Sequence, residues 1–161
     1  MTFDALVNEF CRICEIDEPD RIARGEAVQV DGVDFVLIFD AVDAPDRVLV
    51  YCDYGAVPPE RRSDAYRALL ETNLHTYRRD TAVFAVSPES GRVICATRFR
   101  LEHLHADELL GVMTLLSSKA RQWREHFFVA PASAAPSHAT SFGILSARRG
   151  NGSAAANTEV V

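Results

Sequence analysis

The sequence lacks any apolar run of the roughly 18 residues that a membrane-spanning helix needs. Its first ten residues, MTFDALVNEF, also lack the basic start and the uninterrupted apolar core of a secretory signal. We therefore expect the protein to stay in the cytoplasm. In that compartment its four cysteines are expected to be free thiols.

Motifs of common enzyme and cofactor sites are missing as well. There is no Gly-rich phosphate loop, no G-x-S-x-G elbow and no H-E-x-x-H sequence. Acidic groups such as Glu15, Asp17 and Glu18 fall in predicted turns, where no apolar pocket is indicated that would raise a carboxyl pKa for acid catalysis. The sequence therefore predicts no catalytic residues, no metal, no cofactor and no enzymatic activity.

Two short patterns resemble reactive or metal-binding motifs. Cys11 and Cys14 form C-x-x-C inside a predicted helix, with no preceding strand to place them at a helix N-terminus, so we interpret them as small buried apolar residues. A thiol enzyme that uses this pair is the alternative. His103 and His105 supply only two imidazoles, and we interpret that segment as a loop before a helix.

Charge is distributed unevenly along the chain, whose formal net charge is −6. The first 60 residues carry 14 acidic and 4 basic side chains, and the remainder carry 9 and 13. An acidic first half repels phosphate and anionic lipid, which disfavours binding to nucleic acid or to a membrane surface. The arginines at 61, 62, 67, 78 and 79 are interpreted as solvated surface.

Apolar periodicity predicts three helices and five strands. Apolar residues recur at three- and four-residue steps over 3–14, over a segment that Pro58 opens and Tyr77 closes, and over 107–127. The predicted strands are EAVQV, VDFVLIFDAV, RVLVYCDYG, TAVFAV and RVICATRFRL. Asp31-Gly32 predicts a tight hairpin and a second turn is expected at 43–46, and such short connections permit only antiparallel pairing.

The predicted fold class is therefore α+β, in the order α-β-β-β-α-β-β-α, with a twisted antiparallel sheet packed by helices. Residues 1–129 are expected to form this domain, and the Ala/Ser/Gly-rich segment 130–161 is expected to be a disordered tail. Antiparallel sheets usually keep one face wet, yet VDFVLIF and RVLVYCDY are apolar on both faces. Either helices cover both faces, or apolar surface remains for a partner.

Several stretches in a fixed order carry a resemblance to a known family. They are DYGAVP at 53–58, LLETNL at 69–74, FAVSPESGRV at 84–93, FRL at 99–101 and ARQWR at 120–124. With the acidic pI near 5.3, their order and spacing resemble the Tir-chaperone (CesT-like) family of class I type III secretion chaperones. The resemblance covers residues 3–128.

The resemblance implies a homodimer built around the second helix and the fourth strand. The residues that it implicates in the dimer interface are Tyr66, Leu69, Leu70, Leu74, Val83 and Phe84. Positions in the core of one subunit demand the same residue types, and for Leu69 and Val83 that interpretation is equally good.

The resemblance also implies that the extended, non-globular N-terminal segment of a secreted effector protein wraps around the dimer and adds a strand at a sheet edge. The expected effector-binding residues are Phe3, Leu6, Phe10, Val28, Val30, Phe35, Leu37, Leu49 and Tyr51. Such a chaperone would keep its effector soluble and secretion-competent in the bacterial cytosol and contact secretion-apparatus components such as the export ATPase. The alternative is a non-secretion regulatory or protein-interaction module on the same fold.

Overall fold

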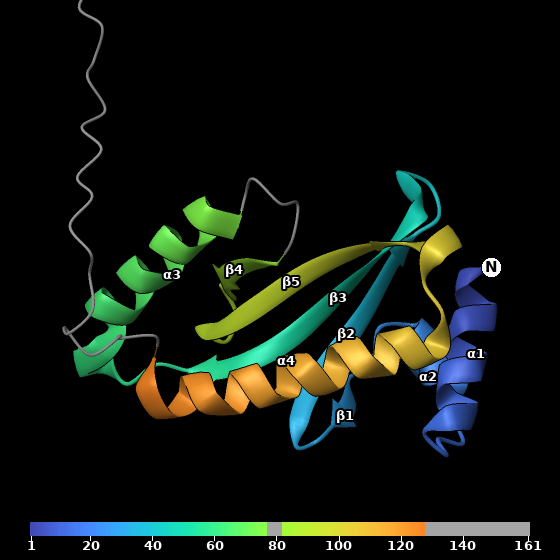
Figure 1. The fold of residues 1–161 in the computed structure, drawn as a ribbon, viewed down its shortest axis with the longest axis horizontal. Coiled ribbons are helices and arrows are strands. Elements are labelled where there is room, and N and C mark those ends of the chain that lie inside the picture. Colours follow the sequence, from blue (N-terminus) through green and yellow to red (C-terminus); the bar gives the residue numbers. More distant parts are fainter. Residues whose placement is uncertain (77–81, 128–161) are drawn as a thin grey trace, which may run out of the picture. The chain divides into compact units, whose positions relative to one another are not determined.

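The computed structural model describes residues 1–76 and 82–127, in which five strands form one sheet accompanied by helices (Figure 1). The predicted tail at 130–161 and the predicted helix end at Tyr77 lie outside the described residues. The elements are α1 Phe3–Ile13, α2 Pro19–Ala23, β1 Val28–Val30, β2 Val33–Asp40, β3 Ala44–Ala56, η1 Pro59–Arg61, α3 Arg62–Thr76, β4 Val83–Val86, β5 Arg92–Arg100, η3 Leu101–His103 and α4 Ala106–His126.

The sheet confirms the α+β class and the antiparallel pairing. Its strands lie in the order β1-β2-β3-β5-β4, and every neighbouring pair is antiparallel. Asp31 and Gly32 have φ values of 50° and 76°, as the predicted tight hairpin requires. The next turn comes earlier than predicted, because the Asp40 carboxylate accepts the backbone N–H groups of Val42 and Asp43.

Two short helical elements begin at prolines, and apolar periodicity did not predict either of them as an element of its own. Pro19 follows the end of α1 and opens the five-residue helix α2. Pro59 likewise opens a 3₁₀ turn that leads into α3. A proline suits such positions because its ring presets φ and a first-turn residue needs no backbone donor. Among the described helices, none has both the length and the apolar character for a bilayer span.

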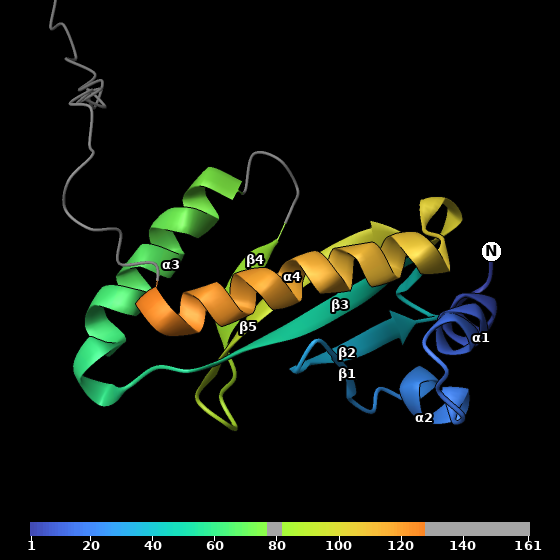
Figure 2. The ribbon, with the colours of Figure 1, turned by 60° about the horizontal axis from the view of Figure 1, so that its bottom comes forward.

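The hydrophobic core lies between one face of the sheet and α4, with α1 packed beside the beginning of α4 (Figures 1 and 2). Phe35, Val50 and Cys95 point from the strands into this core, and none is exposed. The ring of Phe3 stacks on Phe39 at 4.8 Å between centroids, which joins α1 to β2. Within the described residues, helices therefore pack against one face of the sheet.

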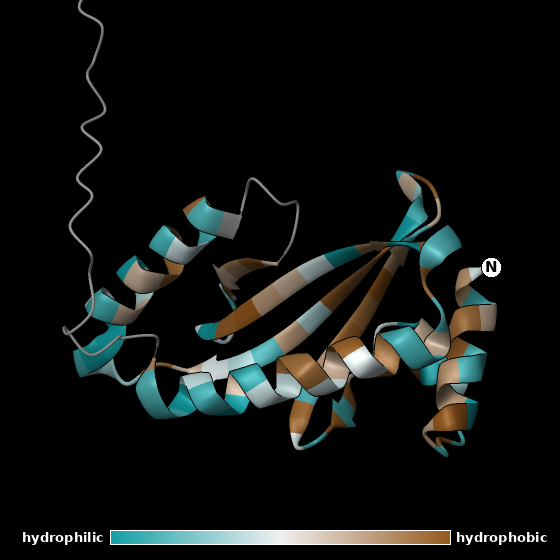
Figure 3. Cartoon of the chain, in the orientation of Figure 1, coloured by the Kyte–Doolittle hydropathy of each residue, from teal (hydrophilic) through white to brown (hydrophobic). Residues whose placement is uncertain are grey.

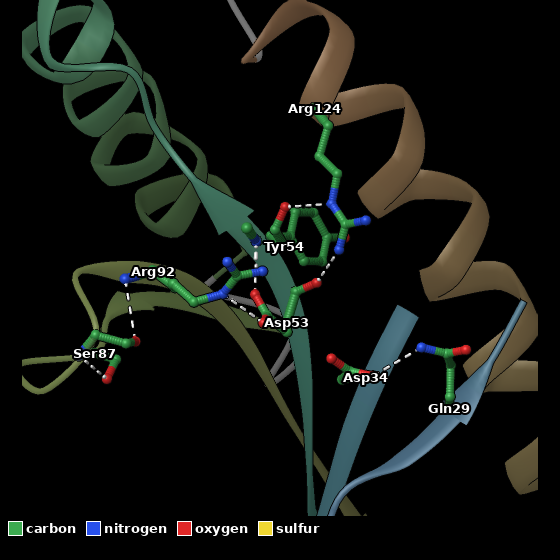
Figure 4. Close-up of polar contacts among 9 residues, drawn as sticks. Gln29, Asp34, Asp53, Tyr54, Ser87, Arg92 and Arg124 are labelled. Atoms are coloured by element: carbon green, nitrogen blue, oxygen red, sulfur yellow. Dashed lines mark hydrogen bonds and ion pairs between the residues drawn. The ribbon is translucent and has the colours of Figure 1, made fainter. Parts of the chain in front are cut away.

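The last turn of α4 is anchored to an irregular point of β3 (Figure 4). Arg124 donates from Nε to the Tyr54 carbonyl and from Nη2 to the Asp53 carbonyl, both at 2.9 Å. The Asp53 carboxylate accepts the Gly55 N–H at 2.7 Å and pairs with Arg92 at 2.7 Å. The β3–β5 register shifts between Asp53 and Gly55, so this network holds a bulge in place.

Gly55→Ala is expected to lower the free energy of unfolding by about 1–3 kcal/mol. The residue has φ of 108°, and an added Cβ would lie 3.2 Å from Arg124 Nε. Gly111→Ala in α4 is the matched control, because nothing lies within 4 Å of its Cβ position and alanine favours a helix interior by about 0.5–1 kcal/mol. Urea unfolding of both variants measures the difference, and equal midpoints would contradict the strain at Gly55.

Candidate partner-binding surfaces

The face of the sheet that points away from α4 forms a surface that we name the open face. Its side chains alternate along each strand with the buried residues of the core face. Its apolar members are Val36, Ile38, Leu49, Tyr51, Val83, Ala85, Ile94 and Ala96. Two of them, Ile38 and Val83, are 40% and 46% exposed, and the other side chains are exposed or half-buried.

Strand register gathers these apolar side chains into two neighbouring rows. One row runs across four strands through Val36, Tyr51, Ala96 and Val83. The adjacent row pairs Ile38 with Leu49. Figure 3 shows that apolar residues occupy much of β2 and the neighbouring part of β3, while β5 is apolar toward its start and hydrophilic toward its end. A contiguous apolar surface that is partly exposed is a candidate interaction site, whereas single exposed apolar residues are not.

A groove of about 250 Å³ lies between α3 and β4. It is lined by Tyr66, Leu69, Leu70, Asn73, Phe84, Ala85 and Val86. Leu70 and Leu74 stand one helical turn apart on α3 and are 69% and 71% exposed. In contrast, Leu69 is buried, so α3 carries apolar side chains both toward the sheet and toward solvent.

Asn73 ties α3 to the outer edge of β4. Its Nδ2 donates to the Phe84 carbonyl at 2.9 Å, and its Oδ1 accepts the Phe84 N–H at 2.8 Å. The amide thus meets both backbone groups of Phe84 on the side opposite β5, as a neighbouring strand would. This contact covers part of an edge that would otherwise be open to pairing.

Asn73→Ala is expected to lower the free energy of unfolding by about 1–3 kcal/mol, because it removes both hydrogen bonds to Phe84. Asn8→Ala is the control, since Asn8 is exposed and donates only within α1, to the Asp4 carbonyl at 2.8 Å. Its effect should stay within about 0.5 kcal/mol. Chemical denaturation compares the two, and an unchanged midpoint for Asn73→Ala would count against its role at the β4 edge.

A second groove, of about 270 Å³, lies beside the edge strand β1. It is lined by Ile16, Glu18, Arg21, Ile22, Glu26, Ala27, Val28 and Gln29. The hairpin that ends β1 is fixed to α4, because Ser117 Oγ donates to the Val30 carbonyl and Arg121 donates to the Asp31 carbonyl, both at 2.8 Å. A held edge strand next to a groove can accept an added strand together with its side chains.

The residues predicted to bind an effector divide between the core and the surface. Six are buried, with exposed fractions of 6% or less: Phe3, Leu6, Phe10, Val28, Phe35 and Leu37. In this fold these six side chains pack inside the subunit. Val30 is half-buried beside the β1 hairpin, and Leu49 and Tyr51 lie on the open face. Sequence reasoning did not include Val36, Ile38 or Ile94, which share that face.

The residues predicted at the dimer interface also fall into groups. Tyr66, Leu69, Leu70 and Phe84 line the α3–β4 groove together. Leu74 extends from the same helix into solvent, and Val83 belongs to the open face. The Phe84 ring also packs edge-on against Tyr54 at 5.1 Å between centroids, so that residue takes part in the core.

Three of the four thiols, those of Cys11, Cys52 and Cys95, are buried, whereas Cys14 is half-buried rather than buried as predicted. Burial raises the pKa of Cys11 and of Cys14, which makes both poorer nucleophiles near neutral pH. Cys52 and Cys95 face each other across β3 and β5, and burial raises the pKa of Cys95 to about 11. His105 immediately precedes α4, where its backbone N–H donates to Glu108. No three metal-capable side chains converge within 1–76 and 82–127.

Comparison with known proteins identifies the fold and the family. Similar folds occur in the crystal structure of the ExsC-ExsE complex (18% identity, TM-score 0.62, covering 83% of this chain and 100% of that one) and in the HopA1-SchA chaperone-effector complex (19%, 0.58, 76% and 93%). No curated protein matches the sequence significantly. The Tir chaperone protein (CesT) family matches residues 6–124, which is well over half of the sequence. The chain therefore belongs to the Tir chaperone protein (CesT) family.

Proposed function

We propose that this protein is a type III secretion chaperone, which binds the extended N-terminal segment of an effector and keeps it soluble in the bacterial cytosol until secretion. Membership of the Tir chaperone family supports the proposal, and so does the likeness to a chaperone-effector complex. The observation that carries it is the open face, whose apolar side chains lie next to one another in two rows on a side of the sheet that no described helix covers.

An unfolded segment needs backbone partners as well as apolar contacts. The edge strand β1 offers the backbone partners, and the groove beside it offers room for alternate side chains of an added strand. At the opposite edge, the amide of Asn73 occupies the Phe84 backbone groups. We therefore place strand addition at β1 and assign the open face to apolar side chains of the same segment.

The functional unit of the proposal is a homodimer joined through α3 and β4. Leu70 and Leu74 are the largest exposed apolar side chains of α3, and the adjacent groove can receive side chains from a second copy. Joining two copies there leaves β1, at the other edge of the sheet, available for the effector. Release at the export ATPase of the secretion apparatus completes the proposed cycle, and no nucleotide is consumed by the chaperone itself.

The test is capture of the client from the native host. The tagged full-length chain is purified together with whatever protein it binds, and the complex is sized by light scattering. The bound protein is identified, and brief digestion of the complex with protease then shows which part of the bound protein is protected. A dimer that protects only the N-terminal segment of a larger, secreted protein is the expected result. A dimer that carries a folded regulator, or no client at all, would assign the fold to a non-secretion interaction module instead.

A further inference from the structure

One end of the open face carries three arginines. Arg47 on β3 lies directly opposite Arg100 on β5, and Arg98 lies opposite Leu49 in the row that also holds Ile38. Directly opposite residues of antiparallel strands have Cβ atoms about 4.5–5.5 Å apart. The three guanidinium groups therefore border the apolar rows at one end of the sheet.

These arginines are available to a ligand. Arg47 reaches Asp46 at 3.4 Å and Arg100 reaches Glu102 at 3.2 Å, but all four side chains are about half exposed. Exposed pairs of this kind contribute little to stability, so a partner's carboxylate can replace them. Arg98 is exposed and forms no ion pair within the described residues. Like charges directly opposite one another are unfavourable, so an anion bound between Arg47 and Arg100 would relieve their repulsion.

The other end of the open face carries carboxylates. Gln29 donates to the Asp34 carboxylate at 3.2 Å, and Asp34 is exposed there without a cationic partner among the described residues (Figure 4). Asp53, on the neighbouring strand, is paired with Arg92. Among the described residues, the face therefore has the unpaired carboxylate of Asp34 at one end and, beyond the apolar rows, the unpaired guanidinium of Arg98 at the other, where Asp46 and Glu102 partly neutralise Arg47 and Arg100. These two unpaired charges give a bound segment a preferred direction.

We propose that the open face selects an amphipathic segment whose apolar side chains are followed by aspartate or glutamate. The apolar side chains pack on Ile38, Leu49 and Tyr51, and the carboxylates meet the arginine end, made of Arg47, Arg98 and Arg100. A nucleic acid would leave the apolar rows unfilled and would meet a chain of net charge −6 elsewhere. This inference rests on the proposed function, since it names the chemistry of the effector segment.

Selection from a random peptide library tests the inference without a known client. The full-length protein is immobilised and presented with phage-displayed peptides of about 15 residues, long enough for an extended or helical bound segment. The enriched peptides are expected to combine apolar residues with an excess of Asp and Glu. The best of them, labelled with fluorescein, should bind the triple variant Arg47→Glu/Arg98→Glu/Arg100→Glu at least about tenfold more weakly, because charge-assisted contacts become repulsive.

The matched control reverses three exposed arginines elsewhere, as Arg12→Glu/Arg24→Glu/Arg67→Glu, and should change the affinity less than about twofold. Circular dichroism verifies the fold, and Arg98→Glu alone replaces the triple variant if that variant does not fold. Enrichment of basic or charge-neutral peptides, no enrichment, or equal weakening by both triple variants would overturn the inference. So would a change of oligomeric state in the Arg47→Glu/Arg98→Glu/Arg100→Glu variant, because a second copy would then occupy the face. Whether the protein is a secretion chaperone is decided by a different experiment, the capture of its client from the native host.

Discussion

Replacing Leu70 and Leu74 with aspartate is expected to convert a dimer into a folded monomer. Both side chains are mostly exposed on one subunit, at 69% and 71%, so the substitutions leave its core untouched. If the proposed α3–β4 interface buries them, each contributes about 1.5–3 kcal/mol to association. Both subunits of the homodimer carry the two substitutions, so four such side chains are lost, which weakens the dimer by about 6–12 kcal/mol, or at least about ten-thousandfold in dissociation constant.

Sedimentation equilibrium over a range of protein concentrations measures this change. Leu115→Asp supplies the control, because Leu115 is also an exposed leucine on a helix, at 56%, but lies on α4 rather than beside the α3–β4 groove. It should leave the dimer intact. A wild-type chain that stays monomeric at micromolar concentration, or a double variant that still dimerises with unchanged affinity, would remove the interface from this surface.

Local signals in the sequence were sufficient to predict the elements that a turn sequence or a long apolar stripe defines. Asp31-Gly32 forms the predicted tight hairpin, because this pair restricts the backbone by itself. The long apolar stripe of α4 was equally clear, since it extends over most of a 21-residue helix. The helix α2 was missed because five residues are too few to display a helical period.

The binding surface was harder to predict, because an apolar stripe looks the same in a core and at an interface. Phe3 and Phe10 were assigned to effector binding, yet both are buried against the sheet and α4. Alternation divides each strand into two faces, but it does not say which one the helices cover. One signal was available: Arg98 and Arg100 alternate with Phe99, which marks their face of β5 as solvent-facing. Combined with the register, those two arginines would have identified Leu49 and Ile38 as surface residues.

The decisive test of the open face is the double variant Ile38→Glu/Tyr51→Glu. Ile38 is 40% exposed and Tyr51 is half-buried on a face that no described helix covers, so the subunit should still fold. Client binding should weaken by at least about a hundredfold, because two apolar anchors worth about 1.5–3 kcal/mol each are replaced by charges that a bound segment would have to desolvate.

Val42→Glu is the matched control: Val42 is 87% exposed, but it lies in the β2–β3 turn and outside the open face. Capture from the native host, quantified against wild type, should therefore lose the client with the double variant and retain it with Val42→Glu. Equal recovery with the double variant would mean that the apolar rows do not hold the effector, and the β1 edge would then have to hold the segment without them.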